Sequence, residues 1–256
     1  MKIAIITGAS SGLGRAFVRR LGRDRTLDAI WTIARNEANL RALAALSAVP
    51  VRTLPMDLTD ADATAQLTAL LAAEKPSVDV LICAAGFGKI AKTAELPPDE
   101  QTNMIDLNCR AAVAVTAACL PYVRKGSRIL EICSTAAFQP MPRLGVYAAS
   151  KAFLQSYTKT LHHELLCSGV HVTAVCPYWI KDTGFIPRAQ GNDRHSYGRF
   201  FLASRADTIA RWALVDSRLN LWVSTPGPVC AIHRLIAKFV PHFIMVPLME
   251  LLRHVI

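Results

Sequence analysis

The sequence predicts an α/β fold, a doubly wound parallel sheet with helices on both faces. Apolar runs of strand length alternate with helical stretches as far as Pro177. The strand candidates are continuously apolar, which is typical of strands buried on both faces of a parallel sheet. Strand and helix in strict succession imply right-handed crossovers. The chain has 256 residues, 52% of them hydrophobic, which suits a single domain with an appended C-terminal extension.

The individual elements follow from these apolar runs in chain order. We expect strands at residues 2–6, 29–34, 51–54, 78–85, 127–133, 169–176 and 221–224. We expect helices to begin near Gly12 and Glu37, to cover 60–74 and 100–123, and to begin again at Tyr147 and Ala206.

Two segments after Pro177 break this pattern. Residues 184–205 have no clean period and are rich in Arg, Gly and aromatic residues; a loop this long in a compact domain is usually functional or disordered. We interpret it as a substrate lid within a domain of residues 1–228. The extension at 229–256 is strongly apolar, but its longest uncharged run, 239–249, is too short to span a bilayer. It is expected to cap the substrate pocket, form a subunit contact or touch a membrane surface.

Composition narrows the classes of protein. The formal net charge is +10, but no zinc-finger spacing, RNA-binding aromatic motif or basic helix-turn-helix is visible. No nucleic-acid partner is therefore expected. Attraction of an anionic cofactor or substrate is the simpler explanation of the charge. The seven cysteines are scattered without a C-x-x-C pair, which predicts reduced thiols and a cytoplasmic location. The N-terminus lacks the pattern of a signal peptide.

The first strand is followed by a glycine-rich turn, TGASSGLG. Gly8, Gly12 and Gly14 allow a tight turn and let the backbone approach a ligand without an intervening Cβ. The helix that follows presents free N–H groups and the positive end of its dipole to a pyrophosphate. A glycine triplet that opens a helix directly after a first parallel strand predicts a dinucleotide site.

The end of the second strand indicates which dinucleotide. An acidic residue at this place usually meets a free ribose 2′-OH, whereas a 2′-phosphate needs a cation. Ala34 fills the acidic position and Arg35 follows it, which favours NADP(H) over NAD(H). Asp57, after the third strand, is placed to accept a hydrogen bond from the adenine amino group.

Taken together, these motifs make the chain resemble the short-chain dehydrogenase/reductase family over about seven-tenths of its length, from Ile3 to about Thr183. The spaced motifs are TGASSGLG, DL at 57–58, CAAG at 83–86, LN at 107–108, CSTAA at 133–137 and YAASK at 147–151. The resemblance implies a Rossmann-like fold, a nicotinamide cofactor and a homodimer or homotetramer.

The resemblance also implies roles for particular residues. Tyr147 is the expected general acid/base, Lys151 lowers its pKa and binds the nicotinamide ribose, Ser134 binds the substrate oxygen, and Asn108 holds a water in a proton relay. The expected cofactor-binding set, besides Tyr147 and Lys151, is Gly8, Ser10, Ser11, Gly12, Leu13, Gly14, Arg35, Asp57, Leu58, Ala84, Ala85, Gly86, Pro177, Ile180 and Thr183.

The tyrosine–lysine pair has a physical rationale of its own. Tyr147 and Lys151 at i, i+4 lie on one helical face. An ammonium about 4 Å from a phenol, at an effective dielectric near 20, favours the phenolate by about 4 kcal/mol, or roughly three pKa units. We therefore expect a Tyr147 pKa close to neutral, where general acid/base catalysis works best.

Three departures from the family pattern stand out. Cys83 replaces the asparagine of the Asn-x-Ala-Gly motif, which puts local bracing in doubt, and Cys133 replaces a frequent serine. Thr183 follows Pro177 one place late, so its role is left open, while the Ile180 backbone is expected to meet the carboxamide. No metal site is expected, because the adjacent His162 and His163 cannot share a helical face.

These observations predict an oxidoreductase that interconverts a ketone and a secondary alcohol on a bulky hydrophobic substrate. A hydroxysteroid or bile acid is the leading class, with a 3-oxoacyl thioester as the alternative. Arg188, Arg194, His195 and Arg199 are candidates to meet an anionic group on it, and Phe185, Phe200 and Phe201 are candidate apolar contacts. A non-catalytic redox-sensing protein is the alternative of another class, but such proteins typically lack the Tyr/Lys pair.

Overall fold

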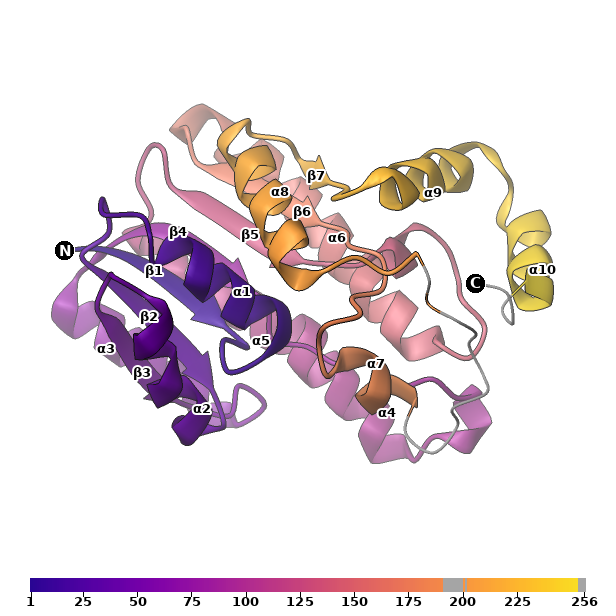
Figure 1. Ribbon diagram of the computed structural model, residues 1–256, viewed down its shortest axis with the longest axis horizontal. Coiled ribbons are helices and arrows are strands. Elements are labelled where there is room, and N and C mark those ends of the chain that lie inside the picture. Colours follow the sequence, from indigo (N-terminus) through magenta and orange to yellow (C-terminus); the bar gives the residue numbers. More distant parts are fainter. Residues whose placement is uncertain (191–199, 201, 253–256) are drawn as a thin grey trace.

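The computed structural model, which describes residues 1–190, 200 and 202–252, has one seven-stranded parallel sheet and confirms the predicted Rossmann-like architecture. The strand order is β3-β2-β1-β4-β5-β6-β7 (Figure 1). The strands are β1 (Lys2–Thr7), β2 (Ala29–Ala34), β3 (Val51–Pro55), β4 (Ser77–Cys83), β5 (Arg128–Ile132), β6 (His171–Val175) and β7 (Val223–Ser224). The order reverses between β1 and β4, so a crevice opens at the carboxyl ends of these two strands.

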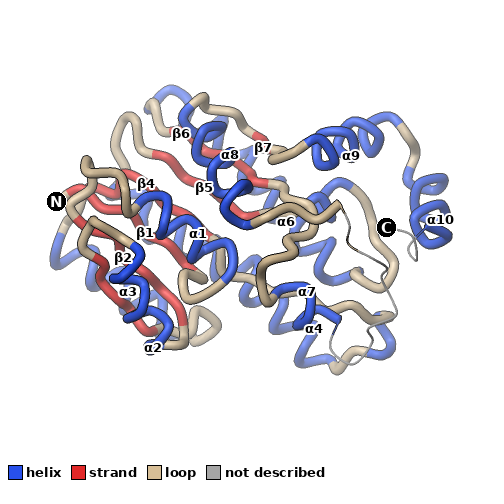
Figure 2. Tube along the Cα trace, in the orientation of Figure 1, coloured by secondary structure: helices blue, strands red, loops and turns tan. Residues whose placement is uncertain are grey.

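Helices cover both faces of this sheet (Figure 2). They are α1 (Gly12–Leu21), α2 (Glu37–Arg41), α3 (Ala61–Glu74), α4 (Pro98–Ile105), α5 (Ala111–Cys119), α6 (Gly145–Leu165), α7 (Phe185–Gln190), α8 (Ala206–Arg218), α9 (Pro228–Phe239) and α10 (His242–Leu252). Helix α6 begins two residues before Tyr147, and α7 occupies part of the segment that we expected to be loop.

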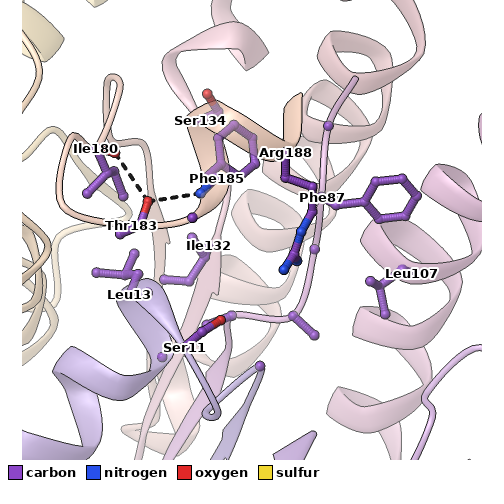
Figure 3. Close-up of a pocket in the computed structure, with 18 of the residues that line it drawn as sticks. Ser11, Leu13, Phe87, Leu107, Ile132, Ser134, Ile180, Thr183, Phe185 and Arg188 are labelled. Atoms are coloured by element: carbon purple, nitrogen blue, oxygen red, sulfur yellow. Dashed lines mark hydrogen bonds between the residues drawn. The ribbon is translucent and has the colours of Figure 1, made fainter. Parts of the chain in front are cut away.

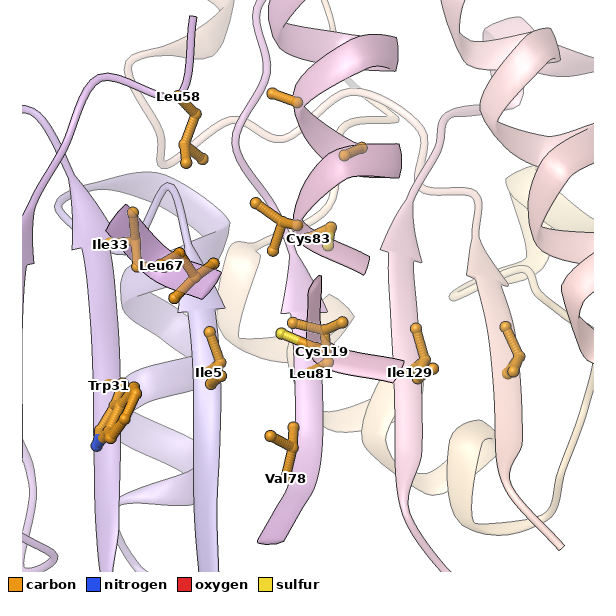
Figure 4. Close-up of a cluster of buried hydrophobic side chains, with 14 of the residues drawn as sticks. Ile5, Trp31, Ile33, Leu58, Leu67, Val78, Leu81, Cys83, Cys119 and Ile129 are labelled. Carbon is orange, nitrogen blue, oxygen red and sulfur yellow. The ribbon is translucent and has the colours of Figure 1, made fainter. Parts of the chain in front are cut away.

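The two faces of the sheet carry separate apolar layers. On one face, Phe17 of α1 and Ile209 of α8 pack over β1, β4 and β5. On the other, α3, α5 and α6 pack over the same strands; Trp31, Ile5 and Ile129 belong to this layer (Figure 4). Because both faces are covered, the strands are apolar throughout, which is why their pattern was continuous rather than alternating.

A long helical segment crosses this second layer. It runs from Pro98 to Tyr122 and is long and apolar enough to cross a membrane by length and composition. In the fold, however, its α5 portion packs against β4 and α3, and Val115 and Cys119 are fully buried there. A core helix of this kind meets the same criteria, so we assign the segment to the interior of the domain. Its middle residues, Asp106–Arg110, form a π-helical turn.

The C-terminal helices lie at the end of the molecule opposite β2 and β3 (Figure 1). Helix α9 packs against the short 3₁₀ helix Thr135–Phe138, which directly follows Ser134. Met249 of α10 packs against the apolar cluster that includes Tyr147. The extension therefore contacts the region around Ser134 and Tyr147.

Candidate active site

A cavity of about 890 Å³ opens at the carboxyl ends of the central strands (Figure 3). Of the residues predicted to bind cofactor or to act in catalysis, all but Asn108 line it. Segments that are far apart in the sequence thus meet in one site, as the reversal of strand order between β1 and β4 requires.

The glycine turn has the geometry expected of a phosphate cradle. Gly8 and Gly12 have φ values of +63° and +52°, which glycine adopts without strain. A Cβ at Gly14 would lie 2.4 Å from the Gly8 carbonyl oxygen, and one at Gly8 would lie 2.8 Å from backbone atoms of Ala85. No side chain caps the amino end of α1, and its first residues face the cavity. These N–H groups fit the pyrophosphate of a dinucleotide.

Arg35 and Asp57 form the far end of the cavity. The Arg35 side chain is 73% exposed, and its guanidinium lies 3.5 Å from the Asp57 carboxylate. The other Asp57 oxygen accepts hydrogen bonds from the backbone N–H and the hydroxyl of Thr59. Although burial opposes it, these Thr59 hydrogen bonds and the Arg35 charge hold the pKa of Asp57 below its usual value. Asp57 therefore positions Arg35, a function additional to the adenine contact that we predicted.

Ser134, Tyr147 and Lys151 meet where β5 ends and α6 begins. The Ser134 hydroxyl lies close enough to Tyr147 to lower the pKa of the phenol, although burial outweighs this effect. Ser134 also accepts a hydrogen bond from the backbone N–H of Ala136, which fixes its rotamer at the start of the 3₁₀ helix. The Lys151 ammonium donates to the Ile132 carbonyl oxygen at 2.7 Å. All three side chains thus have defined positions at the cavity wall.

The predicted lowering of the Tyr147 pKa is wrong for the protein's own groups. Burial raises the pKa of Tyr147 to about 12, against a smaller opposing effect of the Ser134 hydrogen bond. The Lys151 ammonium lies 5.8 Å from the centre of the Tyr147 ring and is directed to the Ile132 carbonyl. Burial also lowers the pKa of Lys151 itself. The spacing of Tyr147 and Lys151 predicts an ammonium next to the phenol. It does not reveal the free-energy cost of burying the phenolate, which dominates here.

Asn108 lies behind the cavity wall and is fully buried. Its amide oxygen accepts from the Phe87 N–H at 3.0 Å, and its amide nitrogen donates to the Phe87 carbonyl and to the Ser150 hydroxyl. The π-helical turn at Asp106–Arg110 delivers the side chain to this position; such turns occur frequently at functional sites. Since these protein partners engage the amide on both sides, the structure gives Asn108 a positioning role for the segment 86–88.

Cys83, which replaces an asparagine of the family motif, belongs to a buried polar chain. Its sulfur lies 3.5 Å from the Thr116 hydroxyl, which donates to Glu131 at 2.6 Å. The bracing that we placed in doubt comes partly from elsewhere, because the Ala85 N–H donates to the Thr7 hydroxyl at 3.0 Å. Glu131 is fully buried with one carboxyl oxygen unpartnered, and burial raises its pKa to about 7.

The segment after β6 is anchored at its base. Ile180 pairs with Ser204 in an isolated parallel bridge, and Asp182 accepts from the Ala206 N–H at 2.8 Å. Thr183, whose role was left open, donates to the Ile180 carbonyl and accepts from the Phe185 N–H (Figure 3). Thr183 therefore shapes the turn into α7, and it also lies beside Gly12. The two ends of the predicted lid are thus held together.

Sequence reasoning missed most of the substrate end of the cavity. Apolar walls that it missed come from loops without a recognisable spacing, at Phe87, Met141, Leu144 and Trp179; Phe185 of α7, one of the predicted apolar contacts, lines the cavity with them. Phe185 packs against Tyr147 with ring centres 5.6 Å apart, and Phe200 packs against Trp179. Arg188, predicted to meet an anionic group, lines the cavity. Arg194, His195, Arg199 and Phe201 lie outside the described residues.

Within the described residues, no group of three or more His, Cys, Asp or Glu side chains has the arrangement of a metal site. His162, one of the two adjacent histidines, is buried and its Nδ1 is hydrogen-bonded to the Val172 carbonyl at 2.8 Å. This bond ties α6 to β6 and gives the residue a structural role.

Comparison with known proteins agrees with the fold and the cavity. Residues 2–192 match the model of the short chain dehydrogenase family. An uncharacterized oxidoreductase of Staphylococcus epidermidis is 28% identical over 230 residues, covering 89% of this chain and 97% of its own. A short-chain dehydrogenase from Sphingobium yanoikuyae in complex with NADPH is 28% identical, with a TM-score of 0.79 over 93% of each chain. One from Burkholderia phymatum in complex with NAD, 22% identical, has a TM-score of 0.77 over 93% of each chain and shows the fold alone.

The fold and the cavity define a nicotinamide-dependent oxidoreductase of the Rossmann class. The family match covers about three-quarters of the chain, so the protein belongs to the short-chain dehydrogenase/reductase family. As a member of that family it is an NAD(P)-dependent enzyme, and the resemblance stated from its motifs is confirmed.

Proposed function

We propose that the enzyme interconverts a ketone and a secondary alcohol, uses NADP(H) in preference to NAD(H), and acts on a hydroxysteroid or bile acid. The observation that carries the reaction is that Ser134 and Tyr147 line the same cavity as the glycine turn. These two hydroxyls provide a hydrogen-bond donor and a proton source for one carbonyl oxygen.

The chain's own residues account for the proton chemistry. The bound nicotinamide ring supplies or accepts the hydride. With a pKa raised to about 12, Tyr147 is a neutral phenol at physiological pH, and it is therefore ready to donate its proton to a carbonyl oxygen as that oxygen gains charge. Ser134 orients the same oxygen by a hydrogen bond. Lys151, one turn further along α6 on the same cavity lining, is the residue expected to bind the nicotinamide ribose.

The cofactor preference rests on Arg35. Its guanidinium is exposed at the cavity end and is held by Asp57 at 3.5 Å, where a ribose 2′-phosphate would meet it. The Sphingobium relative, at 28% identity, is described in complex with NADPH. Both points support NADP(H) as the preferred cofactor.

The substrate class rests on the opposite end of the cavity. Trp179, Phe185 and Met141 give it an apolar wall, and a large rigid hydrocarbon skeleton would bury well against it. Arg188 and Lys89 lie on the same lining; Lys89 is paired with Glu100 at 3.2 Å. An anionic tail such as that of a bile acid has a cation within the same cavity at Arg188.

A substrate panel tests this proposal. NADPH oxidation would be followed with ketosteroids, oxo bile acids and 3-oxoacyl thioesters, each with the parent enzyme and the Ser134→Ala variant. We expect the highest kcat/KM for a ketosteroid or oxo bile acid and loss of turnover in the variant. A higher value for the thioesters would assign the enzyme to that class, and no turnover of any ketone would contradict the proposed reaction.

The assembly and location are part of the same proposal. We expect a homodimer or homotetramer in the cytoplasm, with residues 184–205 as the lid and 229–256 as a separate extension. The seven cysteines, six of them buried, form no disulfide among themselves, which suits a reducing compartment. Sedimentation velocity of the full chain measures the assembly directly; a monomer at all concentrations would contradict it.

A further inference from the structure

Helix α9 presents an apolar stripe to solvent. Ile232, Leu235, Ile236 and Phe239 recur at i, i+3, i+4 and i+7, and all of them are exposed, Phe239 by 71%. The opposite side of the helix is already packed. Cys230 is buried there, and the His233 ring lies against Phe138 with ring centres 5.8 Å apart. The exposed stripe is therefore not the face by which α9 joins the domain.

Helix α10 repeats this arrangement. Met245 is buried and Met249 packs against the cluster around Tyr147, so one side of the helix faces the protein. Apart from the exposed His242 at its start and the half-buried Glu250 near its end, the helix is apolar on its outward side, where a helix at a protein surface normally carries polar residues. The exposed apolar residues are Phe243 (79% exposed), Ile244, Pro247, Leu248 and Leu251 (76% exposed). A helix that is apolar on both sides requires an apolar environment on its outer side as well.

The length of α10 limits what that environment is. Its 11 residues, at 1.5 Å per residue, span about 17 Å, roughly half of a bilayer's hydrocarbon core. Helix α9 is an amphipathic helix of similar length. Helices of this kind lie in the plane of a membrane interface with the apolar face buried at the level of the headgroups.

The charges on this extension favour an anionic surface. Helices α9 and α10 carry Arg234 and Lys238 against one acidic residue, Glu250, within a chain of net charge +10. Lys238 is exposed next to the apolar stripe, with its ammonium 5.6 Å from the centre of the Phe239 ring. A cation beside an exposed apolar stripe matches the surface of an anionic bilayer, which offers an apolar layer below negatively charged headgroups.

We propose that the exposed apolar face of α9 and α10 docks on the surface of an anionic lipid bilayer. The proposal is independent of the reaction that the enzyme catalyses. It does have a consequence for that reaction, because α9 packs on the 3₁₀ helix that follows Ser134, and Met249 packs on the cluster containing Tyr147. Docking through these helices places the substrate end of the molecule near the membrane, where hydrophobic substrates concentrate.

Co-sedimentation of the full chain with vesicles tests the proposal. Vesicles of phosphatidylcholine alone would be compared with vesicles containing about one-third phosphatidylserine, at low and high salt. We expect binding to the anionic vesicles that weakens with salt. The double variant Phe239→Ser/Phe243→Ser should lower the partition coefficient at least about tenfold, since two exposed aromatic side chains no longer enter the interface. Lys238→Glu should lower it on anionic vesicles only.

The matched control is Leu219→Ser, which removes an exposed leucine from the end of α8. It should bind vesicles like the parent, and the thermal unfolding of each variant would show that the fold is kept. Equal binding by the double variant and the parent, or no binding of the parent to either vesicle, would overturn the proposal. Dissociation of a stable dimer by the double variant, without vesicle binding by the parent, would assign the face to a second copy of the chain instead.

Discussion

The two ends of the cavity are built in different ways. At the cofactor end, backbone atoms set the shape: Gly8 and Gly14 approach neighbouring main chain so closely that a Cβ would overlap it. At the substrate end, side chains from separate loops and from α7 set the shape, among them Phe87, Trp179 and Phe185. A backbone-built site tolerates little change and can be recognised by spacing, whereas a side-chain-built site varies freely and determines which substrate fits.

The largest effect expected on cofactor binding lies at the cofactor end. Gly14→Ala would place a Cβ 2.4 Å from the Gly8 carbonyl oxygen, and because both partners are backbone, the turn must shift. We expect NADPH binding to weaken about 10- to 100-fold, as an overpacking cost of 1–3 kcal/mol implies. Cofactor fluorescence titration measures this.

Gly184→Ala is the matched control from the other end. Nothing lies within 4 Å of a Cβ at Gly184, which also lines the cavity. Its NADPH affinity should match the parent's. Similar losses in the two variants would remove the contrast between the two ends.

A smaller effect is expected from the cofactor-selecting cation. Arg35→Asp replaces the guanidinium by a second carboxylate next to Asp57, and it should raise the KM for NADPH about tenfold or more while leaving the KM for NADH within about threefold. Arg41→Asp, which removes an arginine paired with Glu37 on the same helix face, is the control and should change neither KM. Equal effects of Arg35→Asp on the two cofactors would contradict the assignment.

The last effect concerns stability rather than activity and arises beneath the site. Burial raises the pKa of Glu131 from 4.5 to about 7, so the folded protein keeps a proton that the unfolded chain releases between these values. The stability that the folded protein gains by keeping this proton is complete below about pH 4.5. It falls as the pH rises and is lost once the pH has passed through 7. Glu131→Gln cannot ionise, and it should exceed the parent's stability at pH 8 by on the order of 3 kcal/mol.

Thermal unfolding across this pH range checks the prediction. The variant and the parent should unfold at similar temperatures near pH 4.5, and the variant should unfold several degrees higher at pH 8. The exposed Glu164 offers a control, since Glu164→Gln should follow the parent at each pH. A constant difference between Glu131→Gln and the parent would show that Glu131 does not titrate in this window.

Much of the fold was predictable because the strands are buried on both faces and their apolar runs are uninterrupted. The glycine turn, Arg35, Ser134, Tyr147 and Lys151 were predictable because their spacing along the chain is regular. The structure brings them to one cavity, although their roles remain predictions.

Other features depend on tertiary contacts that no local pattern encodes. The helix α7 lies in a segment without periodicity, and the turn role of Thr183 depends on hydrogen bonds within its own loop. The π-helical turn that puts Asn108 behind the cavity wall has no signature in the sequence, and its part in a proton relay stays a prediction. The predicted lowering of the Tyr147 pKa is wrong because burial, which raises this pKa, is a property of the folded chain and has no signature in the sequence.

The central claim is that Tyr147 supplies the proton for carbonyl reduction, and Tyr147→Phe tests it most directly. The ring and its packing against Phe185 are retained, and only the hydroxyl is lost. On the best ketone substrate, we predict unchanged NADPH binding and a kcat lowered about 10²- to 10⁴-fold. Turnover by the phenylalanine variant at the parent's rate would contradict the account.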